Sequence, residues 1–309
     1  MFGNILWFFV LLQHRTQAYN KMILIADSGS TKTTWCVVIE GAVSFTVRTL
    51  GINPVRDGED AIRTVVHNAK EAIDAERIQG RASSFADDGI EQLFFYGAGC
   101  ISPYSVALQR VLEQTFPEAQ VSVNSDMLGA ARALCGLKEG IACILGTGSN
   151  SCLYDGCEVV KDVSPLGWIL GDEGSGAVLG RTLVGDLLKG QLPAALCNDF
   201  LQRYQLTQSG IIEAVYRKPL ANRFLASFVP FLADYREEEG IHTLLVDAFR
   251  CFFRRNVAAY QRQDLPVNFV GSVAYYFERE LAIAAEKENF KIGLILREPM
   301  DKLVIYHCF

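Results

Sequence analysis

Short apolar runs that end abruptly in glycine and hydroxyl residues recur along this chain. The clearest is Ile141–Leu145, which is followed by the turn-forming sequence Gly146–Asn150. A second is Met22–Ala26, which is followed by Asp27 and then by Ser28–Thr34. An apolar run bounded by turn residues predicts a buried strand that enters a tight turn. Two such strand-and-turn pairs, each near an acidic residue, suggest two halves that grip one polyphosphate.

The first 125 residues predict an alternation of strands and helices. Beyond the first strand, a hairpin pattern over residues 35–47 is followed by a helical pattern from Asp57, with apolar residues at three- and four-residue spacing. A buried strand at 92–96, a helix at 105–116 and a short strand at 121–123 complete this part. The order is strand, strand, strand, helix, strand, helix, strand, which indicates an α/β domain.

The second half of the chain repeats this theme. Strands are expected at 141–145, near 152–160 with a turn at Asp155-Gly156, and at 265–270, and a final strand–helix pair is expected at 292–307. Helices are expected at 173–189, 209–216, 222–235, 242–262 and 275–287, and the phenylalanines within them are assigned to core packing. We place the domains at 22–125 and 126–295, with a C-terminal helix at about 296–309 returning to the first.

Composition narrows the class of protein. The chain has 309 residues, half of them hydrophobic, and a net charge of −6 without a basic cluster, which argues against a nucleic-acid-binding protein. Its nine cysteines form no Cys-x-x-Cys pair, which favours free thiols and a cytoplasmic location. No apolar run approaches the roughly 20 residues of a membrane span. Residues 1–21 lack the anatomy of a signal peptide, and we expect a disordered leader or an upstream start.

The two glycine-rich turns are candidate phosphate sites. Glycines allow backbone N–H groups to approach an anion, and hydroxyl side chains add hydrogen-bond donors. The sequence contains neither the P-loop motif nor the dinucleotide-binding motif. An ordinary hairpin turn explains either turn taken alone, so the interpretation depends on their occurring together. A third turn of this kind, Gly271-Ser272, follows the strand at 265–270.

These motifs resemble the BadF/BadG/BcrA/BcrD group of the actin/hexokinase/Hsp70 ATPase superfamily, and within it the N-acetylglucosamine kinases. The resemblance covers residues 22–307. It is carried by these segments in order: Asp27–Thr33, Gly97–Gly99, Asn124–Asp126, Gly146–Asn150, Gly171–Ser175 and Gly271-Ser272. It implies a two-domain actin-like (ribonuclease H-like) α/β fold with a nucleotide cleft between the domains. It also implies transfer of the γ-phosphoryl of ATP to a hexose hydroxyl, with N-acetylglucosamine 6-phosphate as the expected product.

The resemblance also assigns roles to residues, with ATP and Mg²⁺ as cofactors. Asp27 lies near the metal, and Asp126 is the catalytic base. The ATP-binding residues are Gly29, Ser30, Thr31, Lys32, Thr33, Thr147, Gly148, Gly271 and Ser272. The sugar-binding residues are Asn53, Asp126, Ser149, Asn150 and Asp172. Simpler explanations stay open, because Asp126 also suits a helix N-cap and Asp172 the start of a helix.

Two other functions are weighed against the kinase. An activator ATPase for an acyl-CoA dehydratase or reductase would hold a [4Fe–4S] cluster, for which Cys100 is the one tempting ligand. A non-enzymatic sugar sensor on the same fold would need a DNA-binding head, which the sequence lacks. Relatives carry Gly-Trp-Gly before the Gly-Asp-Glu-Gly-Ser segment, whereas this chain has Gly167-Trp168-Ile169. The identity of the amino sugar therefore stays open, as does the choice between monomer and homodimer.

Overall fold

The computed structural model describes residues 22–29, 31–78 and 89–309. The expected leader (1–21) and Ser30 lie outside the described residues. The described chain divides into two compact units. Unit 1 runs to Ala133 and includes Pro299–Phe309, and unit 2 comprises Leu134–Glu298. The boundary that we expected near residue 125 lies instead after Ala133, because helix α4 (Asp126–Cys135) begins in unit 1 and ends in unit 2.

Unit 1 is built on a five-stranded sheet with the order β3-β2-β1-β4-β5. The strands are β1 (Met22–Ser28), β2 (Lys32–Ile39), β3 (Ala42–Leu50), β4 (Gln92–Gly97) and β5 (Gln120–Ser125). The first three pair antiparallel, and β4 and β5 run parallel to β1. Central β1 is buried on both faces, as its unbroken apolar sequence predicts.

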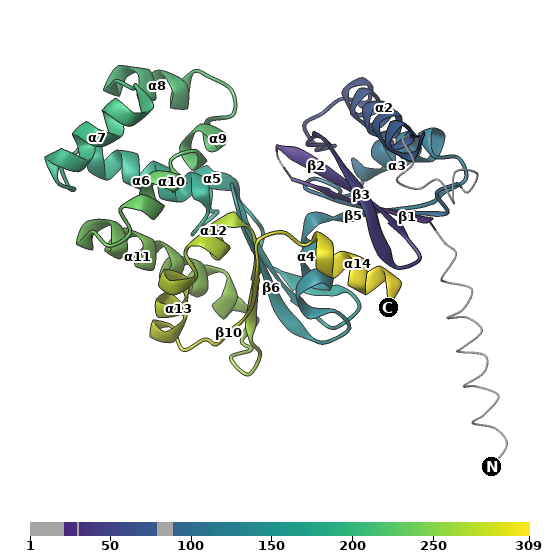
Figure 1. Ribbon diagram of the computed structural model, residues 1–309. Helices are drawn as coiled ribbons and strands as arrows, with labels where there is room; N and C mark the ends of the chain where they lie inside the picture. The colour runs from purple at the N-terminus through teal and green to yellow at the C-terminus, as the bar shows by residue number, and fades with distance from the viewer. Residues whose placement is uncertain (1–21, 30, 79–88) are drawn as a thin grey trace, which may run out of the picture. The chain divides into compact units, whose positions relative to one another are not determined.

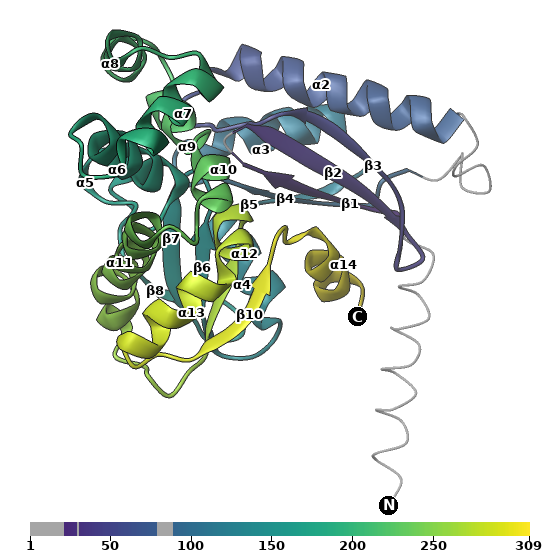
Figure 2. The same ribbon diagram turned by 60° about the vertical axis from the view of Figure 1, so that its left-hand side comes forward.

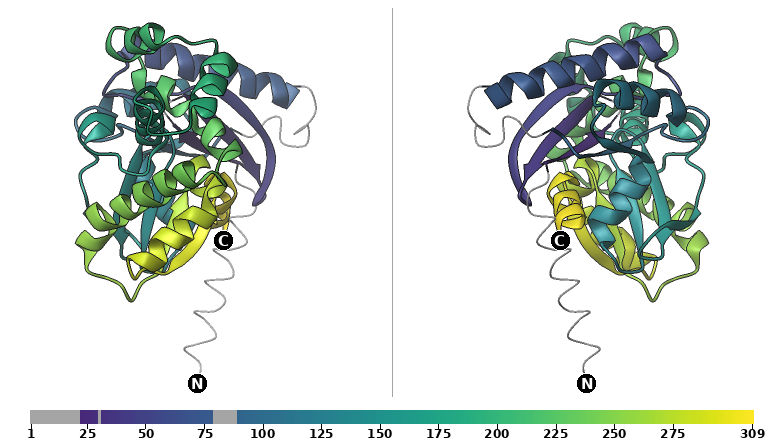
Figure 3. Two further views of the ribbon diagram at one scale, coloured as in Figure 1. Left: turned by 90° about the vertical axis from the view of Figure 1, so that its left-hand side faces the viewer. Right: turned by 90° about the vertical axis from the view of Figure 1, so that its right-hand side faces the viewer.

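Helices cover the sheet of unit 1. Helices α2 (Glu59–Glu76) and α3 (Ser105–Thr115) lie together over one face, as Figures 1 and 2 show. Helix α2 turns Ile62, Val66, Ala69 and Ile73 inward, the spacing that predicted it. The last helix, α14 (Met300–Cys308), packs against β1 and appears in yellow beside the purple strands in Figure 3.

Unit 2 repeats the sheet topology of unit 1. Its order is β10-β9-β6-β7-β8, with two antiparallel pairs on one side of β6 and two parallel pairs on the other. The strands are β6 (Gly140–Leu145), β7 (Ser149–Tyr154), β8 (Val159–Asp162), β9 (Val267–Val270) and β10 (Ile292–Leu296). Strand β6 therefore holds the central place that β1 holds in unit 1, and each is followed by one of the two glycine-rich turns.

Unit 2 carries a much longer helical insertion between its third and fourth strands. The insertion contains α5 (Gly167–Leu170), α6 (Gly176–Leu188), α7 (Ala194–Tyr204), α8 (Gln208–Tyr216), α9 (Ala221–Ala226), α10 (Val229–Asp234), α11 (Glu239–Arg255) and the 3₁₀ helix η4 (Val257–Tyr260). Helices α12 (Ser272–Tyr276) and α13 (Glu278–Lys287) follow β9. None of the helices within the described residues combines the length and the apolar sequence that crossing a membrane requires.

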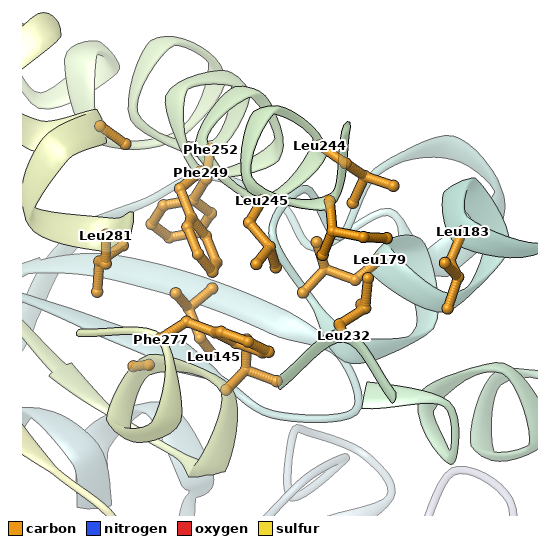
Figure 4. Packing of buried hydrophobic residues seen from close by; sticks show 14 of the residues in the cluster. Leu145, Leu179, Leu183, Leu232, Leu244, Leu245, Phe249, Phe252, Phe277 and Leu281 are labelled. Carbon is orange, nitrogen blue, oxygen red and sulfur yellow. The ribbon is translucent and has the colours of Figure 1, made fainter. Parts of the chain in front are cut away.

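The core of unit 2 is formed where these helices meet β6. Leu245, Phe249 and Phe252 of α11 face Phe277 and Leu281, and Leu145 of β6 lies close by, as Figure 4 shows. All of these side chains are buried. The aromatic residues of α11 therefore pack the core, which confirms the sequence interpretation.

Several predicted helices differ in extent from the observed ones. The helix expected at 222–235 is two helices, α9 and α10, because Pro230 lies in the first turn of α10 and cannot continue the hydrogen bonding of a preceding helix. The helix expected from 173 begins only at Gly176, after the loop that ends in Ser175. Helix α7 was missed, although Leu196 and Phe200 stand at helical spacing and are buried.

Two glycines of α6 permit a matched test of this packing. A Cβ added at Gly180 would lie 2.0 Å from the backbone oxygen of Leu225 in α9, whereas one added at Gly185 would meet nothing within 4 Å. We expect Gly180→Ala to lower the free energy of unfolding by about 1–3 kcal/mol, because α9 must move. Gly185→Ala should raise it by about 0.5–1 kcal/mol, since glycine is unfavourable inside helices. Urea denaturation of both variants measures this, and equal effects would contradict the close contact of α6 with α9.

Candidate active site

Buried hydroxyl groups hold the turn after β1 from its inner side. Ser28 Oγ lies 2.8 Å from Thr33 Oγ1, donates to the Ile52 carbonyl at 3.1 Å and accepts from the Ile52 N–H at 2.9 Å. Thr33 Oγ1 donates to the Leu50 carbonyl at 3.0 Å. Ser28 and Thr33 are fully buried. The Thr33 hydroxyl therefore supports the turn from inside, and the contact of Thr33 with ATP stays a prediction.

The outer edge of this turn stays exposed. Gly29, Thr31 and Lys32 are exposed, and the Gly29 N–H donates to the Lys32 carbonyl at 3.0 Å. A Cβ added at Gly51 would lie 2.3 Å from the Gly29 carbonyl oxygen, so two stretches of backbone pack directly on each other here. This packing fixes the turn while its exposed side remains open to a ligand.

Asp27 and Asn53 lie near the same end of the sheet. Asp27 is half-buried and is paired in register with Tyr96 of β4. Asn53 Oδ1 accepts from the Val55 N–H at 3.0 Å, and a Cβ on Gly99 would lie 2.2 Å from that oxygen. The Gly97–Gly99 segment singled out in the sequence is thus the surface against which the Asn53 amide rests.

Asp126 opens α4, but a different residue caps this helix. The Leu128 N–H donates to Ser125 Oγ at 3.2 Å, the bond that a capping residue accepts from the third helical position. The Asp126 carboxylate accepts from backbone N–H groups next to it, with Oδ1 2.9 Å from the Met127 nitrogen. Burial raises the pKa of the Asp126 carboxyl, and this carboxylate in turn helps to raise the pKa of the nearby Cys100 thiol. The helix-cap explanation of Asp126 therefore loses its main support.

The turn after β6 is tied to the helix that follows it in space. The Gly176 N–H donates to the Gly146 carbonyl at 2.8 Å, and the Ala177 N–H donates to the Thr147 carbonyl at 3.1 Å. A Cβ added at Gly271, where φ is +127°, would lie 2.2 Å from the Leu145 carbonyl oxygen. The structure thus brings the Gly146–Asn150 turn and the Gly271-Ser272 turn into direct contact.

Asp172 lies against the same turn of unit 2. Its φ is +52°, and a Cβ on Gly148 would lie 3.1 Å from its Oδ2. Burial raises the pKa of Asp172 to about 6, with a further contribution from Glu173, and a hydrogen bond from the Gly167 backbone opposes the shift. Ser175 caps α6 by accepting from the Val178 N–H at 3.3 Å. The helix-start explanation therefore fits Ser175 better than Asp172.

The remaining polar residues near this turn separate into two roles. Glu173 pairs with Arg255 at 2.5 Å and accepts from Asn256 at 3.2 Å, so it anchors the loop to the end of α11. Asn150 Oδ1 accepts from the Ser151 N–H at 2.8 Å, and Ser149 is nearly buried. Asp172 and Asn150 thus flank the Gly148 turn in unit 2.

A shallow groove of about 620 Å³ lies between the α10–α11 loop and the segment formed by the end of α12 and α13. It is lined by Arg236, Glu237, Tyr275, Tyr276, Glu278, Arg279 and Ala282. Fully buried Glu280 accepts from Arg236 Nε at 3.1 Å and from Nη2 at 2.5 Å, and Arg236 Nη1 donates to the Tyr276 carbonyl at 3.2 Å. Sequence reasoning missed this groove, because Arg236 and Glu280 are distant in sequence and only helix packing joins them.

The predicted residues fall into two groups, one in each unit. Those in unit 1 are Asp27, Gly29, Thr31, Lys32, Thr33, Asn53 and Asp126, and those in unit 2 are Thr147, Gly148, Ser149, Asn150, Asp172, Gly271 and Ser272. Across the described ranges, no cluster of three or more His, Cys, Asp or Glu residues has a metal-binding arrangement. Asp27 offers a single carboxylate, which suits Mg²⁺ because that ion usually keeps waters and phosphate oxygens as its other ligands.

Comparison with known proteins adds evidence independent of this geometry. No family model matches the chain, and no curated protein sequence matches it. A solved structure of a candidate N-acetylglucosamine kinase from Porphyromonas gingivalis is 49% identical, with a TM-score of 0.85 over 93% of this chain and 99% of that one.

More distant structures share the fold. A candidate N-acetylglucosamine kinase from Chromobacterium violaceum is 16% identical, with a TM-score of 0.71 over 93% of this chain and 99% of that one. The ROK hexokinase of Thermus thermophilus is 17% identical, with a TM-score of 0.50 over 89% of this chain and 92% of that one. The duplicated topology, the paired glycine-rich turns and the high identity to the P. gingivalis protein agree with one another. The chain belongs to the BadF/BadG/BcrA/BcrD family of actin-like ATPases.

Proposed function

We propose that this protein is an ATP-dependent amino-sugar kinase that phosphorylates N-acetylglucosamine at its 6-hydroxyl. The observation that carries the proposal is Asp126, a half-buried carboxyl with a raised pKa at a helix start that Ser125 already caps. Such a group would suit proton transfer better than helix capping. The 49% identity to the P. gingivalis protein supports the substrate class.

The phosphate chain of ATP would be bound by the two glycine-rich turns. In unit 1 the residues are Gly29, Thr31 and Lys32, which are exposed, with Ser30 retained from the sequence, and in unit 2 they are the half-buried Thr147 and Gly148. Mg²⁺, when bound, would neutralise charge on the phosphates, and Asp27 would supply its protein oxygen ligand. Asp126 would accept the proton of the sugar hydroxyl as that oxygen attacks the γ-phosphorus.

The sugar would be recognised by amide and carboxylate groups. Asn53 in unit 1 and Ser149, Asn150 and Asp172 in unit 2 offer acceptors and donors for vicinal hydroxyls. The position of Asp172 against Gly148 would link sugar recognition in unit 2 to the phosphate turn. The adenosine would follow Gly271 and Ser272 into the neighbouring groove, where Tyr275 and Tyr276 present aromatic surface.

The activator alternative gains no support from Cys100. Its thiol is buried, and burial together with the Asp126 charge raises its pKa to about 12. Cluster ligands are thiolates, which this surrounding disfavours. None of the nine cysteines forms a disulfide, which supports a reducing compartment, and we propose the cytoplasm.

The role of Asp126 can be separated from that of Ser125. Asp126→Asn should lower kcat by about 10²–10⁴-fold with little change in the Michaelis constants, because the amide cannot accept the proton. Its melting temperature should not fall, because ionisation of the buried Asp126 carboxyl costs stability. Ser125→Ala should instead lower the free energy of unfolding by about 0.5–2 kcal/mol through loss of the cap. If Asp126→Asn destabilised the protein and kept its kcat, Asp126 would be the cap and not the base.

The phosphate turn of unit 2 is tested by Thr147→Val, which keeps the shape of the side chain and removes its hydroxyl. We expect weaker ATP binding and unchanged sugar binding, both measured by isothermal titration calorimetry with a non-hydrolysable ATP analogue. Thr182→Val is the control, because the Thr182 hydroxyl bonds only within α6 at 3.0 Å among the described contacts. Equal ATP affinity in the two variants would remove Thr147 from the phosphate site.

Asp172 should impose a pH dependence on stability. Its pKa is 3.8 in the unfolded chain and about 6 in the folded protein, so its ionisation costs stability as pH rises between these values. Relative to wild type, Asp172→Asn should therefore gain stability at pH 7 and gain little at pH 4, while losing sugar binding at both.

Asp155 provides a control of opposite sign. Its carboxylate accepts the Cys157 and Glu158 N–H groups, which lowers its pKa below 3.8, so the stability it contributes is present above that value and is lost as the pH falls further. Asp155→Asn should therefore cost stability at pH 7 and cost little near pH 2, and urea midpoints at pH 7, 4 and 2 make both comparisons. If the stability of both variants changed with pH in the same direction, Asp172 would not have the raised pKa that its burial implies.

A further inference from the structure

Tyr96 is a fully buried residue at the end of β4 that the proposed mechanism does not use. In the parallel pairing of the sheet it stands opposite Asp27 of β1 on one side and opposite Asn124 of β5 on the other. It therefore lies in the sheet between the proposed metal-side carboxylate and the strand that leads to Asp126.

The ring of Tyr96 packs directly against α4. A Cβ added at Gly129 would lie 2.8–3.0 Å from three carbon atoms of Tyr96, a distance at which one of the two must move. Gly129 follows Asp126 by one helical turn, so the two lie on neighbouring parts of the same helix face. The tyrosine ring occupies the space that a side chain at 129 would fill, and this contact sets how closely α4 approaches β4.

The hydroxyl of Tyr96 joins α4 to the last helix of the chain. It accepts from Arg132 Nη1 at 2.7 Å and lies 2.9 Å from His307 Nε2. His307 is stacked on Phe94 with ring centroids 3.8 Å apart. Burial and the Arg132 charge lower the pKa of His307 to about 4, so its imidazole is neutral near pH 7, and in the tautomer protonated at Nδ1 its Nε2 accepts a hydrogen bond from the tyrosine hydroxyl. Arg132 also lies over the Tyr306 ring, at 5.2 Å.

These contacts fix the rotation of α4 about its own axis. A helix with side chains has a radius of about 5–6 Å, so a rotation of about 10° moves a carboxylate on its surface by about 1 Å. The Asp126 carboxylate accepts hydrogen bonds from backbone N–H groups in the first turn of its own helix, so its direction follows that rotation. A misplacement of about 1 Å at a reacting group can reduce rate by about 10²-fold.

We propose that Tyr96 is a positioning residue for the phosphoryl transfer: with Arg132 and His307 it holds α4 in the rotation that directs Asp126 at the acceptor hydroxyl. This inference rests on the proposed function of Asp126. It also gives α14 a role, because His307 in this helix contacts the Tyr96 hydroxyl and so helps to hold Asp126 in place.

Tyr96→Phe tests the proposal, because it keeps the ring on Gly129 and removes the hydroxyl. We expect kcat to fall about 10-fold while the Michaelis constants for ATP and sugar stay within about two-fold. Tyr260→Phe is the matched control, since it removes a buried hydroxyl that lies 2.7 Å from Ser151 Oγ in unit 2. Equal kcat in the two variants would overturn the proposal.

A double-mutant cycle separates positioning from a general structural effect. If Tyr96 acts through Asp126, adding Tyr96→Phe to Asp126→Asn should leave the residual kcat unchanged, because no base remains to be positioned. A further 10-fold loss in the double variant would show that Tyr96 acts independently of Asp126 and would overturn the proposal.

Amide hydrogen exchange supplies a readout that needs no turnover. Tyr96→Phe should speed exchange in α4 and α14, and Tyr260→Phe should leave both helices unchanged. A wild-type protein that phosphorylated no amino sugar would refute the proposed function, whereas the exchange data would still decide whether Tyr96 fixes α4. Unchanged exchange in α4 of Tyr96→Phe would overturn the inference even in an active kinase.

Discussion

Direct packing of backbone on backbone, at the end of the central strand of each unit, is the constraint on which the candidate site depends. In unit 1 the segment at Gly51 presses on the Gly29 carbonyl, and in unit 2 Gly271 presses on the Leu145 carbonyl. Neither position has room for a side chain, because an added Cβ would lie 2.3 Å or 2.2 Å from a carbonyl oxygen. Loops are usually the mobile part of a fold. Here the turns are fixed by the strands and segments that flank them, so their exposed edges can present N–H groups without first being ordered by a ligand.

Two acidic residues of the candidate site are not used to cap a helix, which leaves them available for chemistry. An aspartate at the start of a helix normally satisfies the first N–H groups and gains stability from the helix dipole. In this protein Ser125 and Ser175 accept those N–H groups, and each serine lies close in sequence to the acid of interest, Asp126 or Asp172. Both carboxyls then bear a raised pKa from burial, which is an unfavourable arrangement for stability alone. A fold that keeps two such groups after capping its helices by other means is most simply explained by a function for them.

Much of this arrangement could be predicted from sequence, and the failures have identifiable causes. The apolar runs before Ser28 and Gly146 predicted the central strands, since a buried strand needs no long-range information to be recognised. The inward position of Thr33 was not predicted, because it is set by the register of β2 with β1 and β3, in which the Thr33 hydroxyl meets the Leu50 carbonyl of the hairpin partner. Whether Ser125 or Asp126 caps the helix depends on a shift of one residue, and sequence patterns do not locate the end of a helix that finely. The groove at Arg236 depends on a pairing with Glu280 that no local pattern signals.

The two units share a sheet topology but differ in how many helices connect their third and fourth strands. Unit 1 places one helix between its third and fourth strands among the described residues, whereas unit 2 places the whole run from α5 to η4 in the equivalent connection. That insertion contributes Asp172, the Ser175 cap and Arg236, so the residues proposed to recognise sugar and nucleotide in unit 2 come from it or rest against it. Unit 1 instead receives the end of the chain, and α14 reinforces the sheet and α4 through His307 and Tyr96. In the proposed mechanism, the insertion would supply recognition in unit 2, and α14 would supply rigidity in unit 1. This division is what a proposed kinase requires, since the base must be held still while the substrates are selected.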